Sequence, residues 1–244
     1  MNQLDIHLLD LPNEILIIIL KKLDNVDVLY SLFGINNERL DILVQDDVFT
    51  NTLNFERVSS ITDDKLDRFC TSILPQIHRC LKKLILETAS MERILVASDY
   101  PNLTSLELFN CGQDTIFRYF TDDSVFRHIS KYQITDLILH NNDEHTNKIS
   151  LKTYARNFYA HIMVFFENLE QLTIVSSSVN EYPALLLHNL PSTTYFSTTL
   201  TVLSINVFVF DDCLCLLDDR LNQLATFIVQ IHYITSPLYI SRNI

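Results

Sequence analysis

Glycine is the residue that this sequence most conspicuously lacks. The 244-residue chain contains two glycines, Gly34 and Gly112. Phosphate-binding loops, dinucleotide-binding turns and nucleophile elbows each need several glycines, because the backbone there turns sharply or approaches a ligand closely. Neither glycine completes such a pattern. The sequence therefore argues against most nucleotide-using enzymes and against the α/β-hydrolases.

Basic residues, cysteines and long apolar runs are also few. The 18 Lys and Arg residues are scattered, and the formal net charge of −12 disfavours a nucleic-acid surface. The five cysteines form no even, closely spaced framework, which is typical of a reducing compartment. The longest apolar runs, residues 15–20 and 162–166, are far shorter than the ~18 residues of a membrane span. No basic segment of a signal peptide opens the sequence. We expect a cytoplasmic or nuclear protein that binds neither nucleic acid nor membrane.

Side chains suited to metal binding or catalysis occur without a convergent pattern. His140 and His145 flank an Asn-Asn-Asp-Glu segment, but a metal site usually needs three or four convergent ligands and a second shell. Cys213 and Cys215 lie in the apolar segment CLCLL and are typical of buried core. We predict no metal, no cofactor and no catalytic residue.

Residues 8–44 predict three short helices. Pro12 suits the first position of a helix, Gly34 interrupts the pattern, and a third helix is expected from Glu38 to Val44. The first helix is apolar on more than one side. We assign Ile15, Ile18, Ile19 and Leu23 to the side that packs on the other two helices, and Leu16, Ile17 and Leu20 to a different side. Such surplus apolar surface indicates either a partner or a helix wholly buried in a larger core.

This stretch resembles an F-box. The residues LPNEILIIILKKL followed by DNVDVLYSLFGIN match its Leu-Pro pair, its Glu, its apolar helix and its later acidic positions, although no Trp follows in the third helix. F-box proteins are substrate receptors of cullin–RING ubiquitin ligases, and the F-box docks on an SKP-type adaptor. The resemblance implies that the matching positions bind this adaptor. They are Leu11, Pro12, Ile15, Leu16, Ile19, Leu20, Leu23, Val28 and Leu29.

A Leu-x-x-Leu-x-Leu pattern recurs through the rest of the chain. Its copies start at Leu81, Leu103, Ile134, Leu169 and Leu200, with a weaker sixth copy at Leu221. The pattern resembles a degenerate leucine-rich repeat array. In such repeats Asn or Cys usually follows three residues after the last leucine position, and here only Cys111 and Asn142 fit.

The two resemblances imply an α/β fold with two domains. Residues 1–47 would form the F-box, and residues 48–244 an irregular leucine-rich-repeat-like solenoid, possibly truncated at its C-terminus. Its curved parallel sheet would carry helices on the convex side. We expect an early strand at residues 48–55 and helices at residues 63–74, where Pro75 ends the helix, 91–97, 114–129 and 152–166.

Side chains alternate along a strand, which nominates a binding surface. The leucines at the fourth and sixth motif positions should point into the core, and the residues beside them should line the concave face. The residues that we assign to substrate binding are Ile85, Glu87, Glu107, Phe109, Ile138, His140, Thr173 and Val175. The alternative is a solvated sheet face, with binding on the loops.

Together these patterns predict a non-catalytic receptor. The chain would be the substrate-recognition adaptor of an SKP–cullin–F-box ubiquitin ligase, holding an unidentified protein substrate. The alternative is a ligase-independent repeat scaffold whose N-terminal helices merely cap the array. The sequence offers no motif for a third possibility, an enzyme.

Overall fold

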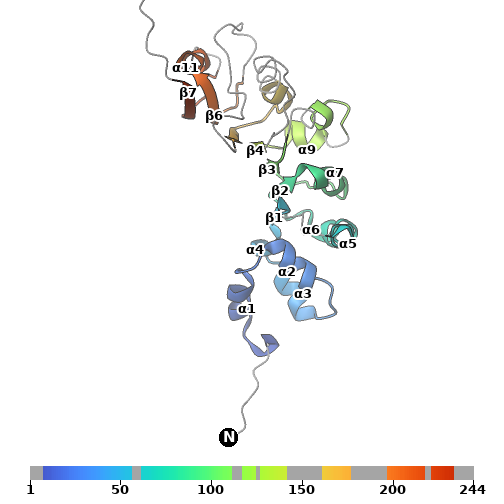
Figure 1. Ribbon diagram of the computed structural model, residues 1–244. Coiled ribbons are helices and arrows are strands. Elements are labelled where there is room, and N and C mark those ends of the chain that lie inside the picture. Colours follow the sequence, from blue (N-terminus) through green and yellow to red (C-terminus); the bar gives the residue numbers. More distant parts are fainter. Residues whose placement is uncertain are drawn as a thin grey trace, which may run out of the picture. The chain divides into compact units, whose positions relative to one another are not determined.

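The computed structural model describes residues 8–56, 62–111, 117–124, 127–141, 161–176, 197–217 and 221–233. The chain divides into two compact units, Met1–Leu103 and Thr104–Ile244. Both units combine helices with parallel strands, so the fold is α/β, as predicted (Figure 1).

The first unit begins with short helices. They are η1 (Leu8–Asp10), α1 (Asn13–Leu20), α2 (Asn25–Leu32), α3 (Glu38–Val44) and α4 (Asp47–Thr50). Pro12 occupies the N-cap of α1 and not its first helical position. The third helix has the predicted bounds. Its N-terminus is fixed by Asn37, whose Oδ1 accepts a hydrogen bond from the backbone N–H of Leu40 at 3.2 Å.

The predicted strand at residues 48–55 is wrong in its first half. Residues 47–50 form α4, because Asp46 occupies its N-cap and its Oδ1 accepts a hydrogen bond from the N–H of Val48. Strand β1 (Thr52–Asn54) follows and pairs in parallel with β2 (Lys83–Glu87). Helix α2 contacts both α4 and β1, so residues on both sides of the predicted domain boundary belong to one compact unit.

Four helical segments connect or follow these two strands. Helix α5 (Asp63–Arg68), the π-helical turn η3 (Phe69–Ile73) and α6 (Leu74–Ile77) run without interruption, and α7 (Thr88–Val96) comes directly after β2. The prediction that Pro75 ends the helix that begins at residue 63 is wrong. Pro75 lies in the first turn of α6, and the helical segment continues past it to Ile77.

The second unit contains five parallel strands among its described residues. They are β3 (Ser105–Phe109), β4 (Asp136–Asn141), β5 (Gln171–Ser176), β6 (Val202–Val209) and β7 (Thr226–Tyr233). Each strand pairs with the next one in the sequence. Helix α9 (Arg127–Tyr132) precedes β4, and α11 (Phe210–Leu216) follows β6.

The helices between these strands differ from the prediction. The helix expected at residues 114–129 is interrupted, since residues 120–124 are not helical and α9 starts at Arg127. Of the helix expected at residues 152–166, the described part is helical from residue 161 to residue 165. No helix among the described residues is long and apolar enough to cross a membrane.

Leucine-type side chains at alternate strand positions form the core, as predicted. Those at the fourth and sixth motif positions are at most 4% exposed in β2, β3, β4, β5 and β6. They are Leu84, Leu86, Leu106, Leu108, Leu137, Leu139, Leu172, Ile174, Leu203 and Ile205.

Backbone carbonyls at the strand entrances repeat one hydrogen-bond arrangement. The carbonyl oxygen of Thr104 accepts hydrogen bonds from the N–H groups of both Thr135 and Asp136, at 2.9 and 3.1 Å. The same two-donor arrangement occurs at the carbonyls of Asn51, Thr135, Glu170 and Thr201. The carbonyl of each turn thus fixes the start of the next strand.

This arrangement corrects the sixth copy of the motif. The carbonyl of Thr201 accepts from Ala225 and Thr226, and Leu203 pairs with Phe227. The sixth copy therefore starts at Leu224, three residues after the predicted Leu221. The same arrangement reveals an earlier copy, in which buried Thr50 takes the first position and Leu53 the fourth.

We predict that Leu137→Ala lowers the free energy of unfolding by about 2–5 kcal/mol, because Leu137 is fully buried and its truncation leaves a cavity. Thr173→Ala, on the partly exposed side of the neighbouring strand β5, should change it by less than about 0.5 kcal/mol. Chemical denaturation measures both values. Equal effects of the two substitutions would contradict the assigned strand faces.

Candidate functional site

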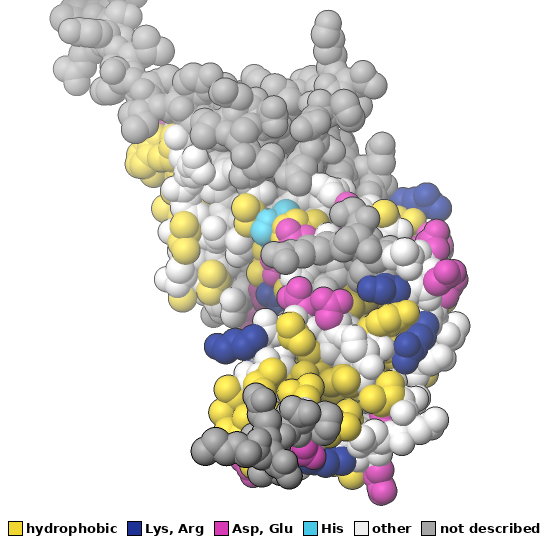
Figure 2. Space-filling model, turned by 60° about the horizontal axis from the view of Figure 1, so that its bottom comes forward, with side chains coloured by type: hydrophobic (Ala, Val, Ile, Leu, Met, Phe, Trp, Pro, Cys, Tyr) yellow, Lys and Arg dark blue, Asp and Glu magenta, His cyan; other side chains and the backbone are white. Residues whose placement is uncertain are grey.

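Helix α1 presents an apolar face to solvent. Leu16 and Leu20 are buried, at 1% and 5% exposure, whereas Ile18 and Leu23 are 56% and 55% exposed. Ile15 and Ile19 are exposed too. We call Ile15, Ile18 and Ile19 of α1, together with Leu23 in the turn that follows the helix, the α1 face. Figure 2 shows hydrophobic side chains gathered at the N-terminal end of the molecule.

This orientation reverses the one that we expected. The α1 face was assigned to packing on α2 and α3, and Leu16 and Leu20 to the surplus side. The reason for the error is the unbroken apolar run at residues 15–20, which has no polar side to fix the rotation of the helix. Leu16 and Leu20, one helical turn apart, are the pair that packs inward.

The structure divides the nine residues that the resemblance assigns to adaptor binding. Pro12, Ile15, Ile19 and Leu23 are exposed, and Leu11 is partly exposed. The buried members are Leu16, Leu20, Val28 and Leu29. The sequence resemblance missed five more exposed apolar residues in these helices and turns: Leu8, Leu9, Ile18, Ile35 and Ile42. For Ile18 the signal was present in the continuous apolar run.

A second surface lies on the sheet of the second unit. The pairing register places Glu107, Ile138 and Thr173 in one row and Phe109, His140 and Val175 in the next. These six predicted substrate-binding residues are partly or well exposed and alternate with the buried leucines. We call them the open sheet face. The other two predicted residues, Ile85 and Glu87, are partly exposed on β2 of the first unit.

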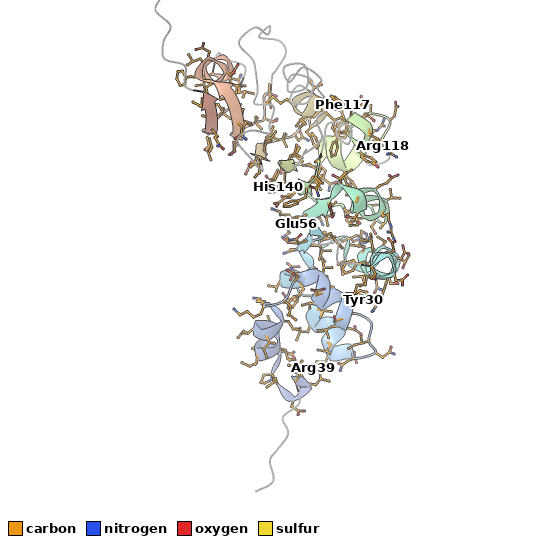
Figure 3. All side chains as sticks on the ribbon, viewed as in Figure 1. Tyr30, Arg39, Glu56, Phe117, Arg118 and His140 are labelled. Carbon is orange, nitrogen blue, oxygen red and sulfur yellow. The ribbon has the colours of Figure 1, made fainter. Side chains whose placement is uncertain are left out.

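His140 is held inside the open sheet face (Figure 3). Its Nε2 lies 2.8 Å from Oε1 of Glu107, and its ring stacks on Phe109 with 3.9 Å between centroids and an interplanar angle of 7°. Beside them, the hydroxyl of Ser105 donates a hydrogen bond to Oδ2 of Asp136 at 2.7 Å. Polar groups of this face therefore bond one another across neighbouring strands.

The candidate metal ligands and the paired cysteines of the sequence can be placed only in part. The described residues contain no group of three or more His, Cys, Asp and Glu side chains placed to hold a metal ion. His145, one of the candidate ligands, lies outside the described residues. Cys213 is buried, as predicted for a core residue, and nothing is described for the side chain of Cys215.

Shifted pKa values belong to groups away from both surfaces. Burial raises the pKa of the Cys70 and Cys213 thiols and of the Tyr100 hydroxyl. A raised thiol pKa leaves less thiolate near neutral pH, so both cysteines are poorly suited to act as nucleophiles. A hydrogen bond from Lys131 lowers the pKa of the exposed Asp122 carboxyl.

A small pocket lies beside Tyr30 in the first unit. It is lined by Val26, Asp27, Tyr30, Phe55, Lys65, Leu66 and Phe69 and encloses about 10 Å³, room for about one water molecule. The Lys65 ammonium and the Arg68 guanidinium lie 5.0 and 4.7 Å from the centre of the Tyr30 ring. These cation–π contacts join α2 to α5, and the pocket is too small for a metabolite.

The chain matched no protein-family model and no curated protein sequence. Its functional interpretation therefore rests on the two surfaces described above.

We predict that Leu16→Ala lowers the free energy of unfolding by about 2–5 kcal/mol, because the Leu16 side chain is buried. Ile18→Ala, two residues away on the α1 face, should cost less than about 1 kcal/mol, since it leaves no cavity. Denaturant titrations of both variants check this difference. A larger loss for Ile18→Ala would contradict the orientation of α1.

Proposed function

We propose that this chain is a non-catalytic substrate receptor of an SKP–cullin–F-box ubiquitin ligase. The observation that carries the proposal is the α1 face: four large aliphatic side chains exposed on one short helix and the turn after it, within the stretch that resembles an F-box. Contiguous exposed apolar surface on a folded protein commonly marks an interaction site.

The α1 face supplies a plausible share of an adaptor interface. Fully burying one large aliphatic side chain gains roughly 1.5–3 kcal/mol, and the members of the α1 face are already partly covered. Covering the rest of all four would still contribute several kcal/mol. The buried members of the predicted set, Leu16, Leu20, Val28 and Leu29, would support this surface from inside.

The strands supply the second half of the proposal. Parallel strands that each pair with the next one in sequence, and the two-donor carbonyls at their entrances, support the leucine-rich-repeat interpretation. The open sheet face would hold the protein substrate through its mixture of apolar and polar side chains. The receptor's contribution to ubiquitin transfer would be proximity, which raises the effective concentration of substrate lysines.

One observation favours the alternative of a ligase-independent scaffold. The side-chain amide of Asn25 in α2 donates hydrogen bonds to the carbonyls of Val48 and Thr52, at 3.1 and 2.9 Å. Helix α2 therefore covers the start of β1, as a capping element of a repeat array would. Capping alone gives the α1 face no role, which allows the two functions to be distinguished.

We predict that the wild-type chain binds a purified SKP-type adaptor and that Ile18→Asp weakens this binding at least about 100-fold. The reason is that the introduced carboxylate would lose its water in an apolar interface. Titration calorimetry measures the affinity. Because Ile18 is 56% exposed, the thermal unfolding midpoint of the variant should stay close to that of the wild type.

Val96→Asp is the matched control. Val96 is 61% exposed on α7, so the same charge is added at a similar exposure away from the α1 face. It should leave adaptor binding unchanged. If the folded wild-type chain does not bind the adaptor, the receptor proposal fails and the scaffold is the better account.

A further inference from the structure

The guanidinium of Arg39 connects α3 to the start of α1. Its Nε donates a hydrogen bond to Oδ1 of Asn13 at 2.8 Å, its Nη1 to the carbonyl of Leu9 at 2.7 Å, and its Nη2 to the carbonyl of Leu11 at 2.5 Å. All three nitrogens are thus in use, on acceptors at least 26 positions away in the sequence. Figure 3 labels Arg39 beside the N-terminal helices of the first unit.

The two carbonyls lie where the backbone of α1 offers them no donor. The hydrogen bonds at the start of α1 begin with the Pro12 carbonyl, which accepts from Ile15 and Leu16. The carbonyls of Leu9 and Leu11 precede it, in η1 and the turn into the helix. Arg39 therefore determines how the chain enters α1.

Arg39 is itself held in place by the turn before α3. Gly34 and Asn36 adopt left-handed φ angles of 71° and 61°, and the N–H of Gly34 donates to Oδ1 of Asp41 at 2.6 Å. Asn37 caps α3 one turn before Leu40. The first turn of α3, which carries Arg39, is thus fixed at both of its ends before the guanidinium reaches α1.

Only an arginine fits this arrangement. The guanidinium is planar and presents its donors in a fixed fork, so it can reach three acceptors in different directions. A lysine ammonium at the same position keeps the charge but places its donors around one nitrogen. It would reach only part of the acceptor set.

We propose that Arg39 is a positioning residue for the α1 face. By fixing residues 9–13 it sets where α1 begins and how the α1 face is presented to its partner. This inference rests on the proposed function, adaptor docking through the α1 face. Arg39 acts through α1 and need not contact the partner.

The test compares Arg39→Gln and Arg39→Lys in the full chain, with Arg79→Gln as the matched control. Arg79 is also an exposed arginine of the first unit, so its substitution removes the same charge elsewhere. Three quantities are measured: the thermal unfolding midpoint, amide hydrogen exchange in peptides covering residues 8–20, and the affinity for a purified SKP-type adaptor.

For Arg39→Gln we expect exchange at residues 8–16 to become at least about fivefold faster and the adaptor affinity to fall about tenfold. Arg39→Lys should recover part of both, and Arg79→Gln should match the wild type. The unfolding midpoint should change little, because Arg39 lies on the surface.

The outcomes separate this inference from the proposed function. We call the three hydrogen bonds from Arg39 to residues 9–13 the Arg39 clamp. Unchanged exchange in Arg39→Gln would show that the clamp does not hold residues 8–16, and would overturn the inference. Faster exchange with unchanged affinity would show a clamp that does not position the α1 face, and would overturn the inference while the receptor function stands. If the wild type binds no adaptor, the receptor function fails and the positioning role fails with it, while the exchange data still report whether the clamp exists.

Discussion

The two-donor carbonyl at the entrances of β2, β4, β5, β6 and β7 is the interaction on which the rest of the structure depends. At Thr104, for example, one oxygen receives the N–H groups of both Thr135 and Asp136, so the next strand can start at one position only. A shift of one residue would move every leucine of that strand to the opposite side of the sheet. The carbonyls thus keep the leucine rows buried and leave Thr173 and its neighbours on the open sheet face partly or well exposed.

Strand β1 lies at the edge of this strand ladder, and its free edge needs a covering element. An uncovered edge strand offers unpaired backbone groups to other chains. Here α2 contacts β1, and Asn25 donates to the carbonyls of Val48 and Thr52. Covering the edge uses the polar N-terminal end of α2, and Val28 and Leu29 of the same helix are buried. This leaves α1, whose Leu16 and Leu20 alone are buried, free to present its other apolar side chains.

The sequence predicted an element correctly where its apolar pattern allowed only one orientation, and failed where the pattern allowed several. Alternation along Leu106-Glu107-Leu108 has two sides, one apolar and one mixed, so the strand and its inner face followed directly. Helix α1 is apolar all round, and only packing chose Leu16 and Leu20 over the α1 face. The sixth copy was placed at Leu221 because Leu221 and Leu224 have the spacing of the first and fourth motif positions. The copy at Thr50 was missed because a buried threonine replaces its first leucine. Arg39 could not be predicted at all, since its acceptors are two backbone carbonyls and one amide far away in the sequence.

The two candidate surfaces, the open sheet face and the α1 face, are held by different kinds of interaction. Substitutions on one should therefore have little effect on the other. The open sheet face is built on strand register, with the ring of His140 stacked on Phe109 and its Nε2 beside Glu107. The α1 face is set by hydrogen bonds from one exposed arginine and by two buried leucines. They belong to different compact units, so substitutions in one should be nearly additive with substitutions in the other. In the proposed receptor function this separation matters, because residues such as Thr173 and Val175 could be replaced while the hydrogen bonds of Arg39 to residues 9–13 are kept.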